Sequence, residues 1–174
     1  MLFRSRRGEE FVTRKITKNV VRIKNQYNTS SFEPLELGNL DARRDWSDAE
    51  DFVEGVWMML NQEKGEERDY VLSSNETHSI REFVEEAFNF AGFGSEECKW
   101  VGEGVDEKYM HGDKVLVQIN PAFYRPAEVE LLLGDSTKAR EDLGWKPKTS
   151  FLGLVKKMVD SDMDKWYIPI YASR

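Results

Sequence analysis

Apolar residues recur every three or four positions in several stretches of the chain, a spacing that predicts amphipathic helices. Over residues 10–23 they form one stripe that we expect to be buried: Phe11, Val12, Ile16, Val20 and Ile23. The same spacing predicts helices over residues 48–63, 78–93, 137–143 and 150–163. We expect Ser47 to cap the first of these four. Ser79 and Glu82 have the pattern of a capping box for the second, and Gly92 should end it.

Short runs of apolar and β-branched residues between these helices predict strands. They lie at residues 35–37, 69–75, 98–102 and 114–119, and the run at 69–75 reads as a buried strand. Helices that alternate with short strands favour α/β layers. The strands are too few for a complete doubly wound sheet, so we expect only part of one.

Composition narrows the function classes. The 174 residues carry a net charge of −7, and 33% of them are charged. An acidic chain has no bulk attraction for nucleic acid or for an anionic membrane, so we expect neither as a partner. Cys98 is the single cysteine, which suits a reducing compartment. With no signal peptide and no apolar run of about 20 residues, we expect a cytoplasmic protein.

Basic residues cluster where predicted elements begin or end. The clusters are Arg6-Arg7, Arg14-Lys15, Arg43-Arg44 and Arg125. The planar guanidinium fork suits phosphate oxygens, and a diphosphate would draw on two arginines from different loops. Arg44 and Arg125 both sit at junctions, and Glu128 could accept hydrogen bonds from a vicinal diol such as a ribose. Taken singly, each arginine reads more readily as a solvated surface charge.

Other residues offer weaker candidates for chemistry. His78 and His111 are isolated and read as loop residues, with His111 exposed, so they make no nucleophilic set with Cys98. The group Asp45, Asp48, Glu50 and Asp51 resembles a metal cluster, although acids at a helix start more often offset the helix dipole. We therefore assign no metal site and no catalytic residue. The larger aromatic residues read as core: Trp46, Trp57, Phe83, Phe88 and Phe90.

Four segments together resemble one enzyme family. They read RRGEEFVTRKIT, LELGNLDARRDWSDAEDFVEGVWMML, HSIREFVEEAF and YRPAEVELLLGDSTKAREDLGWKP. In this order they are similar to the C-terminal half of the GDP-mannose 4,6-dehydratases, which are extended short-chain dehydrogenase/reductases. The resemblance runs from Arg6 to Met163. It implies an α/β fold that comprises the C-terminal edge of a Rossmann-type sheet and the small α/β substrate-binding domain.

The resemblance also implies site residues and a ligand. Val12 and Lys15 would line the nucleotide-sugar site, Gly38 and Asn39 would lie near the guanine, and Glu128 would meet the ribose. Arg44 and Arg125 would hold the diphosphate of GDP-mannose or a related GDP-sugar. Residues 1–60 would be a remnant of the nucleotide-binding domain with substrate-site helices, and residues 61–174 the sugar-nucleotide-binding subdomain.

The chain departs from the family pattern in two respects. The family binds NADP at a glycine-rich turn and uses Thr, Glu, Tyr and Lys in catalysis, and all of these precede the region that the chain matches. Where the family usually has Gly-His-Ala-Lys-Asp-Tyr, this chain has Ser47 to Phe52 with three acids. We therefore expect no dehydration of GDP-mannose by this chain alone. It would work with an N-terminal half or a full-length homologue. The alternatives are a non-catalytic GDP-sugar-binding or dimerisation module, or a truncated gene product. In a truncated product we expect the helices at residues 11–23 and 52–60 to lack packing partners and to expose apolar faces.

Overall fold

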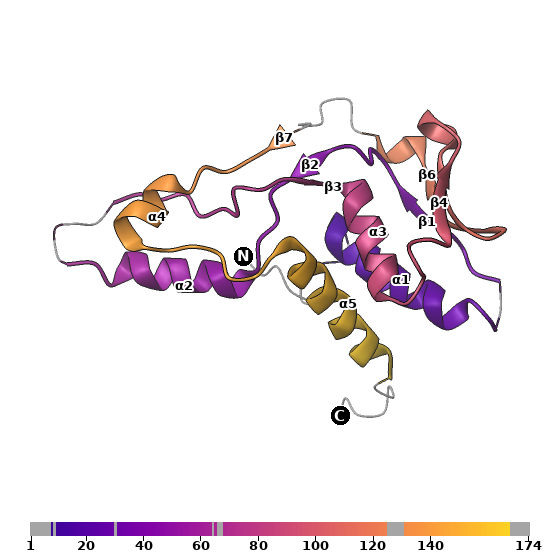
Figure 1. Ribbon diagram of the computed structural model, residues 1–174, viewed down its shortest axis with the longest axis horizontal. Helices are drawn as coiled ribbons and strands as arrows, with labels where there is room; N and C mark the ends of the chain where they lie inside the picture. The colour runs from indigo at the N-terminus through magenta and orange to yellow at the C-terminus, as the bar shows by residue number, and fades with distance from the viewer. Residues whose placement is uncertain are drawn as a thin grey trace.

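The computed structural model describes residues 8, 10–29, 31–63, 65, 68–124 and 131–167. Three helices, α1 (Val12–Gln26), α3 (Ile80–Phe90) and α5 (Phe151–Tyr167), gather beside a sheet. Two others, α2 (Ala49–Leu60) and α4 (Thr137–Leu143), form an arm that extends away from that sheet (Figure 1). Long connecting segments lead from the sheet to the arm and back, so residues far apart in sequence meet where the two parts join.

The larger sheet has the strand order β1-β6-β5-β4. Its strands are β1 (Leu35–Leu37), β4 (Cys98–Val101), β5 (Lys108–His111) and β6 (Lys114–Ile119), with the short 3₁₀ helix η1 (Gly104–Asp106) between β4 and β5. β1 pairs with β6 in parallel, and the other two pairings are antiparallel. The strands expected at residues 35–37, 98–102 and 114–119 are therefore confirmed to within a residue.

A smaller sheet crosses the middle of the molecule in the order β3-β2-β7. Its strands are β2 (Arg43–Arg44), β3 (His78–Ser79) and β7 (Leu131–Leu132). β2 pairs antiparallel with β3 and in parallel with β7, so Arg44 lies on the central strand, opposite His78 on one side and Leu132 on the other. This pairing fixes the backbone from which the Arg44 side chain projects.

The main core lies between α1, α3, α5 and the larger sheet. Ile16, Val20 and Ile23 of α1 are fully buried there, as the spacing predicted. Phe11 was expected in the same stripe, but it precedes the helix as its N-cap and is 42% exposed. We also expected α1 to lack a packing partner, and this is wrong because α5 covers it. Asp162 of α5 is buried, pairs with Arg14 and accepts a 2.7 Å hydrogen bond from Thr17.

Helix α2 buries only part of its apolar surface. Four apolar side chains at helical spacing are exposed: Val53, Val56, Trp57 and Leu60. The expectation that α2 would lack a packing partner on this face is confirmed for the described residues, and the assignment of Trp57 to the core is wrong. Asp48 is the N-cap, its side chain accepting from the amide of Glu50, so the expected cap at Ser47 is off by one residue. The caps of α3 are as predicted, with Ser79 accepting from the amide of Glu82 and Gly92 at φ +90°.

The segment at residues 69–75 is extended but is no strand. Val71 is 54% exposed, which contradicts the expectation of a buried strand. Side chains anchor the segment instead: the carboxylate of Asp45 accepts from the amides of Ser74 and Asn75 at 3.0 and 3.2 Å. A strand needs a neighbour with which to form hydrogen bonds, and no described segment takes that place. Among the described helices, none is long and apolar enough to cross a membrane.

Candidate functional site

The first two turns of α1 form one wall of a pocket of about 830 Å³. The turn after β1 and the 3₁₀ helix η2 (Pro121–Phe123) form other walls, and Arg44 of β2 contributes its side chain. The residues predicted from the sequence that line it are Val12, Lys15, Gly38, Asn39 and Arg44. The fold thus brings together five predicted residues from three separate segments. Arg125 and Glu128 lie outside the described residues.

Local structure explains why these side chains meet. Val12 and Lys15 are three positions apart on α1, so both face the pocket. Gly38 and Asn39 follow β1, and the Asn39 side chain accepts a 2.9 Å hydrogen bond from the amide of Asp41, which shapes the turn. The backbone then enters β2, where pairing on both sides fixes Arg44.

A glycine is required at residue 38 because η2 packs against it. A Cβ atom there would lie 2.6 Å from the carbonyl oxygen of Phe123, which is closer than atoms can approach. The Lys15 ammonium lies 4.0 Å from the centre of the Phe123 ring. Burial lowers the pKa of Lys15, and the nearby Glu36 carboxylate works against that shift. The pocket therefore holds a partly desolvated cation beside an aromatic face.

Glu36 and Asn120 brace the wall that carries Phe123. The two oxygens of Glu36 accept hydrogen bonds from the side chains of Gln118 at 3.0 Å and Asn120 at 2.9 Å. These bonds lower the pKa of the Glu36 carboxyl group. Asn120 also accepts from the amide of Ala122 and donates its own amide to Leu37. Sequence reasoning missed this brace; the signal was a charged residue between two apolar residues in a short strand.

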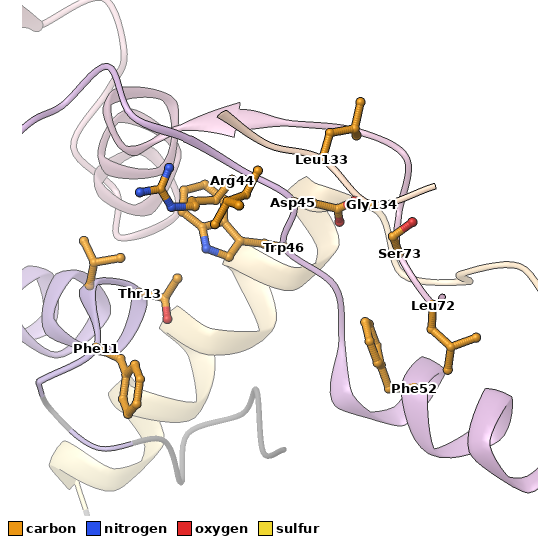
Figure 2. A pocket seen from close by; sticks show the side chains of 12 residues that line it. Phe11, Thr13, Arg44, Asp45, Trp46, Phe52, Leu72, Ser73, Leu133 and Gly134 are labelled. Carbon is orange, nitrogen blue, oxygen red and sulfur yellow. The ribbon is translucent and has the colours of Figure 1, made fainter. Parts of the chain in front are cut away.

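Arg44 also borders a second hollow, of about 550 Å³, between α1, the segment after β2 and the start of α2 (Figure 2). Figure 2 shows Thr13 on α1 and Phe52 on α2 at either side of it, with Trp46 between them. Its other lining residues include Phe11, Leu72, Leu133 and Gly134, so most of the lining is apolar. Arg44 lines both hollows, as do Phe11 and Val12, so these residues separate the polar pocket from the apolar hollow.

The other predicted basic residues have structural roles. Arg14 turns away from the pocket to pair with Asp162, with only 12% of its side chain exposed. Arg43 donates to the carboxylate of Glu82 at 3.2 Å and to the carbonyl oxygen of Thr77 at 2.6 Å. Arg6 and Arg7 lie outside the described residues. Of the basic clusters that the structure describes, only Lys15 and Arg44 contribute to the pocket.

The acidic group at the start of α2 holds backbone segments together. Asp45 binds the amides of residues 74 and 75, and Asp48 caps α2 and pairs with Lys157 at 2.5 Å. The buried Asp51 accepts from the amide of Thr149 at 3.0 Å. Across the part of the chain that the structure describes, no cluster of three His, Cys, Asp or Glu residues could hold a metal ion. The helix-start interpretation fits Asp48 as the N-cap and Glu50 and Asp51 in the first turn of α2, whereas Asp45 anchors the segment at residues 74 and 75.

Both histidines lie outside the pocket and contact aromatic rings. His78 stacks on Phe151 with 3.7 Å between ring centroids and bonds to Glu82 at 2.8 Å. His111 bridges the hydroxyl of Tyr27 at 2.6 Å and the carboxylate of Glu97 at 2.8 Å. Only 20% of the His111 side chain is exposed, so its expected exposure is wrong. The expectation that both histidines lie in loops is also wrong, because His78 begins β3 and His111 ends β5.

Comparisons with known proteins cover nearly the whole chain. The family model described as GDP-mannose 4,6 dehydratase matches residues 3–158. The GDP-mannose 4,6 dehydratase of Drosophila melanogaster is 48% identical over 161 residues, which are 91% of this chain and 38% of that protein. The protein of the same name from Dictyostelium discoideum is also 48% identical over 161 residues, 91% of this chain and 43% of that one. The chain thus spans about two fifths of these relatives.

Solved structures show the same arrangement of elements. The structure of RMD from Pseudomonas aeruginosa, complexed with NADPH, superimposes with a TM-score of 0.68 at 18% identity. It covers 91% of this chain, which corresponds to 44% of that structure. At this identity the likeness is one of fold. It supports the expected α/β fold class.

Proposed function

Because the chain belongs to the GDP-mannose 4,6-dehydratase family, we propose that its pocket holds the GDP-sugar substrate of such an enzyme. The observation that carries the proposal is the convergence of Lys15, Arg44 and the turn at Gly38 in one pocket. A chain with a net charge of −7 repels a diphosphate in bulk, so binding needs a local group of cations. Lys15 and Arg44 supply that group from two separate elements.

Each lining residue suits one part of a GDP-sugar. Arg44, together with Arg125, would grip the diphosphate through the guanidinium fork, and Lys15 would add a third positive charge. Gly38 and Asn39 would lie against the guanine, where the backbone can approach closely and the side-chain amide can form hydrogen bonds. Val12 offers an apolar contact, and Glu128 would accept from the ribose hydroxyls.

The proposed reaction converts GDP-mannose to GDP-4-keto-6-deoxymannose with NADP as the hydride carrier, and this chain would contribute only substrate binding. We propose that an N-terminal half or a full-length homologue supplies NADP binding and the catalytic groups. We also propose that the protein is cytoplasmic. We also propose a boundary near residue 60 between the two parts of the chain.

A second candidate is a non-catalytic module that binds GDP-sugars or associates with a homologue. The exposed side chains of Val53, Val56, Trp57 and Leu60 favour association, because they form one apolar face on α2. Both candidates use the same pocket. They differ in whether a catalytic partner completes the reaction.

Calorimetric titration of GDP-mannose into the purified chain tests the pocket. We expect binding that weakens at least about tenfold in Arg44→Gln and in Arg125→Ala, because each variant loses one charge-assisted contact to phosphate. Lys99→Gln is the matched control, since it also removes one positive charge but lies exposed on β4. A folded chain that gives no heat, or equal losses in the control, would contradict the proposal.

Turnover separates the two candidates. The chain with NADP and GDP-mannose should form no keto sugar, because a grip on diphosphate cannot replace an acid, a base or a hydride carrier. Addition of a separately expressed N-terminal half of a relative should restore turnover if the chain is a substrate-binding half. Binding of that half without turnover would favour the non-catalytic module.

A further inference from the structure

A contact between the Lys15 ammonium of α1 and the Phe123 ring of η2 bridges two walls of the pocket. We propose that their contact is a latch, in which the Phe123 ring holds the Lys15 ammonium until an anionic ligand draws it away. The inference rests on the proposed function, since it describes how the same pocket is regulated. The ring would compete with the diphosphate for one of the few cations that line the pocket.

The geometry is that of a cation–π contact. The Lys15 nitrogen lies 4.0 Å from the ring centroid, well within the range of about 6 Å for this interaction. Phe123 is 46% exposed, so it is open to solvent as well as being in contact with the ammonium. An ammonium in this place is only partly hydrated, and it gains the electrostatic attraction of the ring face. A phosphate oxygen offers a stronger acceptor for the same proton donor.

The ring cannot easily follow the ammonium into the pocket, because its backbone is fixed. Asn120 ties η2 to the end of β1 through its amide bond to Leu37, at 2.8 Å, and through its side-chain bond to Glu36. The carbonyl of Phe123 packs against Gly38, where even a Cβ atom would not fit. Lys15, by contrast, reaches the ring through a flexible four-carbon stem. The ammonium is therefore the part that moves.

The latch predicts that removing the ring improves anion binding. Phe123→Leu keeps an apolar side chain but loses the π face, so Lys15 becomes available without first leaving the ring. We expect pyrophosphate to bind about two- to fivefold more tightly to Phe123→Leu than to the natural chain, the range given by an exposed cation–π contact. Pyrophosphate is the probe because it has no base, so the ring cannot contribute a stacking contact. Phe123→Tyr keeps a π face and should restore the natural affinity.

Nuclear magnetic resonance reports the latch directly. The ε-methylene protons of Lys15 should be shifted upfield by the ring current of Phe123, should lose that shift in Phe123→Leu, and should lose it when pyrophosphate binds. Equal or weaker pyrophosphate binding by Phe123→Leu, with GDP-mannose binding intact, would refute the latch alone. An upfield shift that persists at saturation would refute it too. Loss of all anion binding, GDP-mannose included, would refute the proposed function and the latch with it.

Discussion

The indole nitrogen of Trp145 donates a 2.9 Å hydrogen bond to the backbone carbonyl oxygen of Asp51. Trp145 is only 2% exposed, and its ring meets that of Phe52 edge to face. Gly55 leaves room for it, since a Cβ atom there would lie 2.9 Å from the indole nitrogen. The contact joins α2 to the segment after α4, so it holds the two sides of the arm together.

Trp145→Phe should destabilise the protein by about 2–4 kcal/mol, because it removes a buried hydrogen bond and leaves a cavity beside Gly55. Urea unfolding followed by circular dichroism measures the loss. Trp166→Phe is the control, since Trp166 is 47% exposed near the end of α5. A similar loss in both variants would show that the Trp145 contact does not hold the arm.

Glu36 should make stability depend on pH. Hydrogen bonds from Asn120 and Gln118 lower the pKa of its carboxyl group below the usual 4.5, so the folded state favours the charged form. This contribution is present in full above pH 4.5 and is lost as the pH falls through the lower pKa of the folded state. In Glu36→Gln the new side-chain NH₂ group would face the NH₂ group of Gln118 or Asn120, and two donors cannot form a hydrogen bond with each other. The variant should therefore be less stable at pH 7.

Thermal unfolding between pH 7 and pH 3 checks this prediction. The difference in melting temperature between the natural chain and Glu36→Gln should shrink as the pH falls below about 4.5. Glu96→Gln, which changes an exposed residue of the turn before β4, should have the same melting temperature as the natural chain at every pH in this range. A constant difference over the whole range would mean that the Glu36 carboxylate is not the group that titrates.

Gly38→Ala should damage the pocket more than the fold. The added methyl group would lie 2.6 Å from the Phe123 carbonyl oxygen, so η2 must move away. We expect a loss of about 1–3 kcal/mol in stability and a larger relative loss in affinity for GDP-mannose. Gly94→Ala is the matched control, since the nearest atom to a Cβ there is 3.8 Å away. Unchanged affinity in Gly38→Ala would exclude this turn from the site.

Trp57→Gln tests the exposed face of α2. Trp57 is 64% exposed, so the change should alter stability by no more than about 0.5 kcal/mol, whereas Trp46→Gln, at a residue that is 9% exposed, should cost several times more. If the apolar face docks on a partner, Trp57→Gln should weaken association with an N-terminal half or a homologue. Analytical ultracentrifugation of the mixture measures this, and unchanged association would exclude the face.

Spacing along the chain predicted the five described helices but only three of the seven described strands, β1, β4 and β6. Local periodicity is hard to recognise in strands of two to four residues, but it reflects which side of an element faces the core. The stripe of Ile16, Val20 and Ile23 and the cap at Ser79 are confirmed for that reason. Where the sequence prediction failed, the cause lies in distant partners. Phe11 precedes its helix, Val71 lacks a neighbouring strand among the described residues, and α5 supplied the packing partner that α1 was expected to lack.

By itself, the sequence determined the family, the helices and the candidate cations of the pocket, because motifs and periodicity are local properties of the chain. Only the tertiary structure decided which cations meet. In the folded chain Arg14 pairs with Asp162 and Arg43 pairs with Glu82, whereas Lys15 and Arg44 line the same pocket. It also revealed the bracing of Phe123 by Glu36 and Asn120, residues 84 positions apart. Pairing across such a separation depends on strand register and packing, which no local pattern encodes.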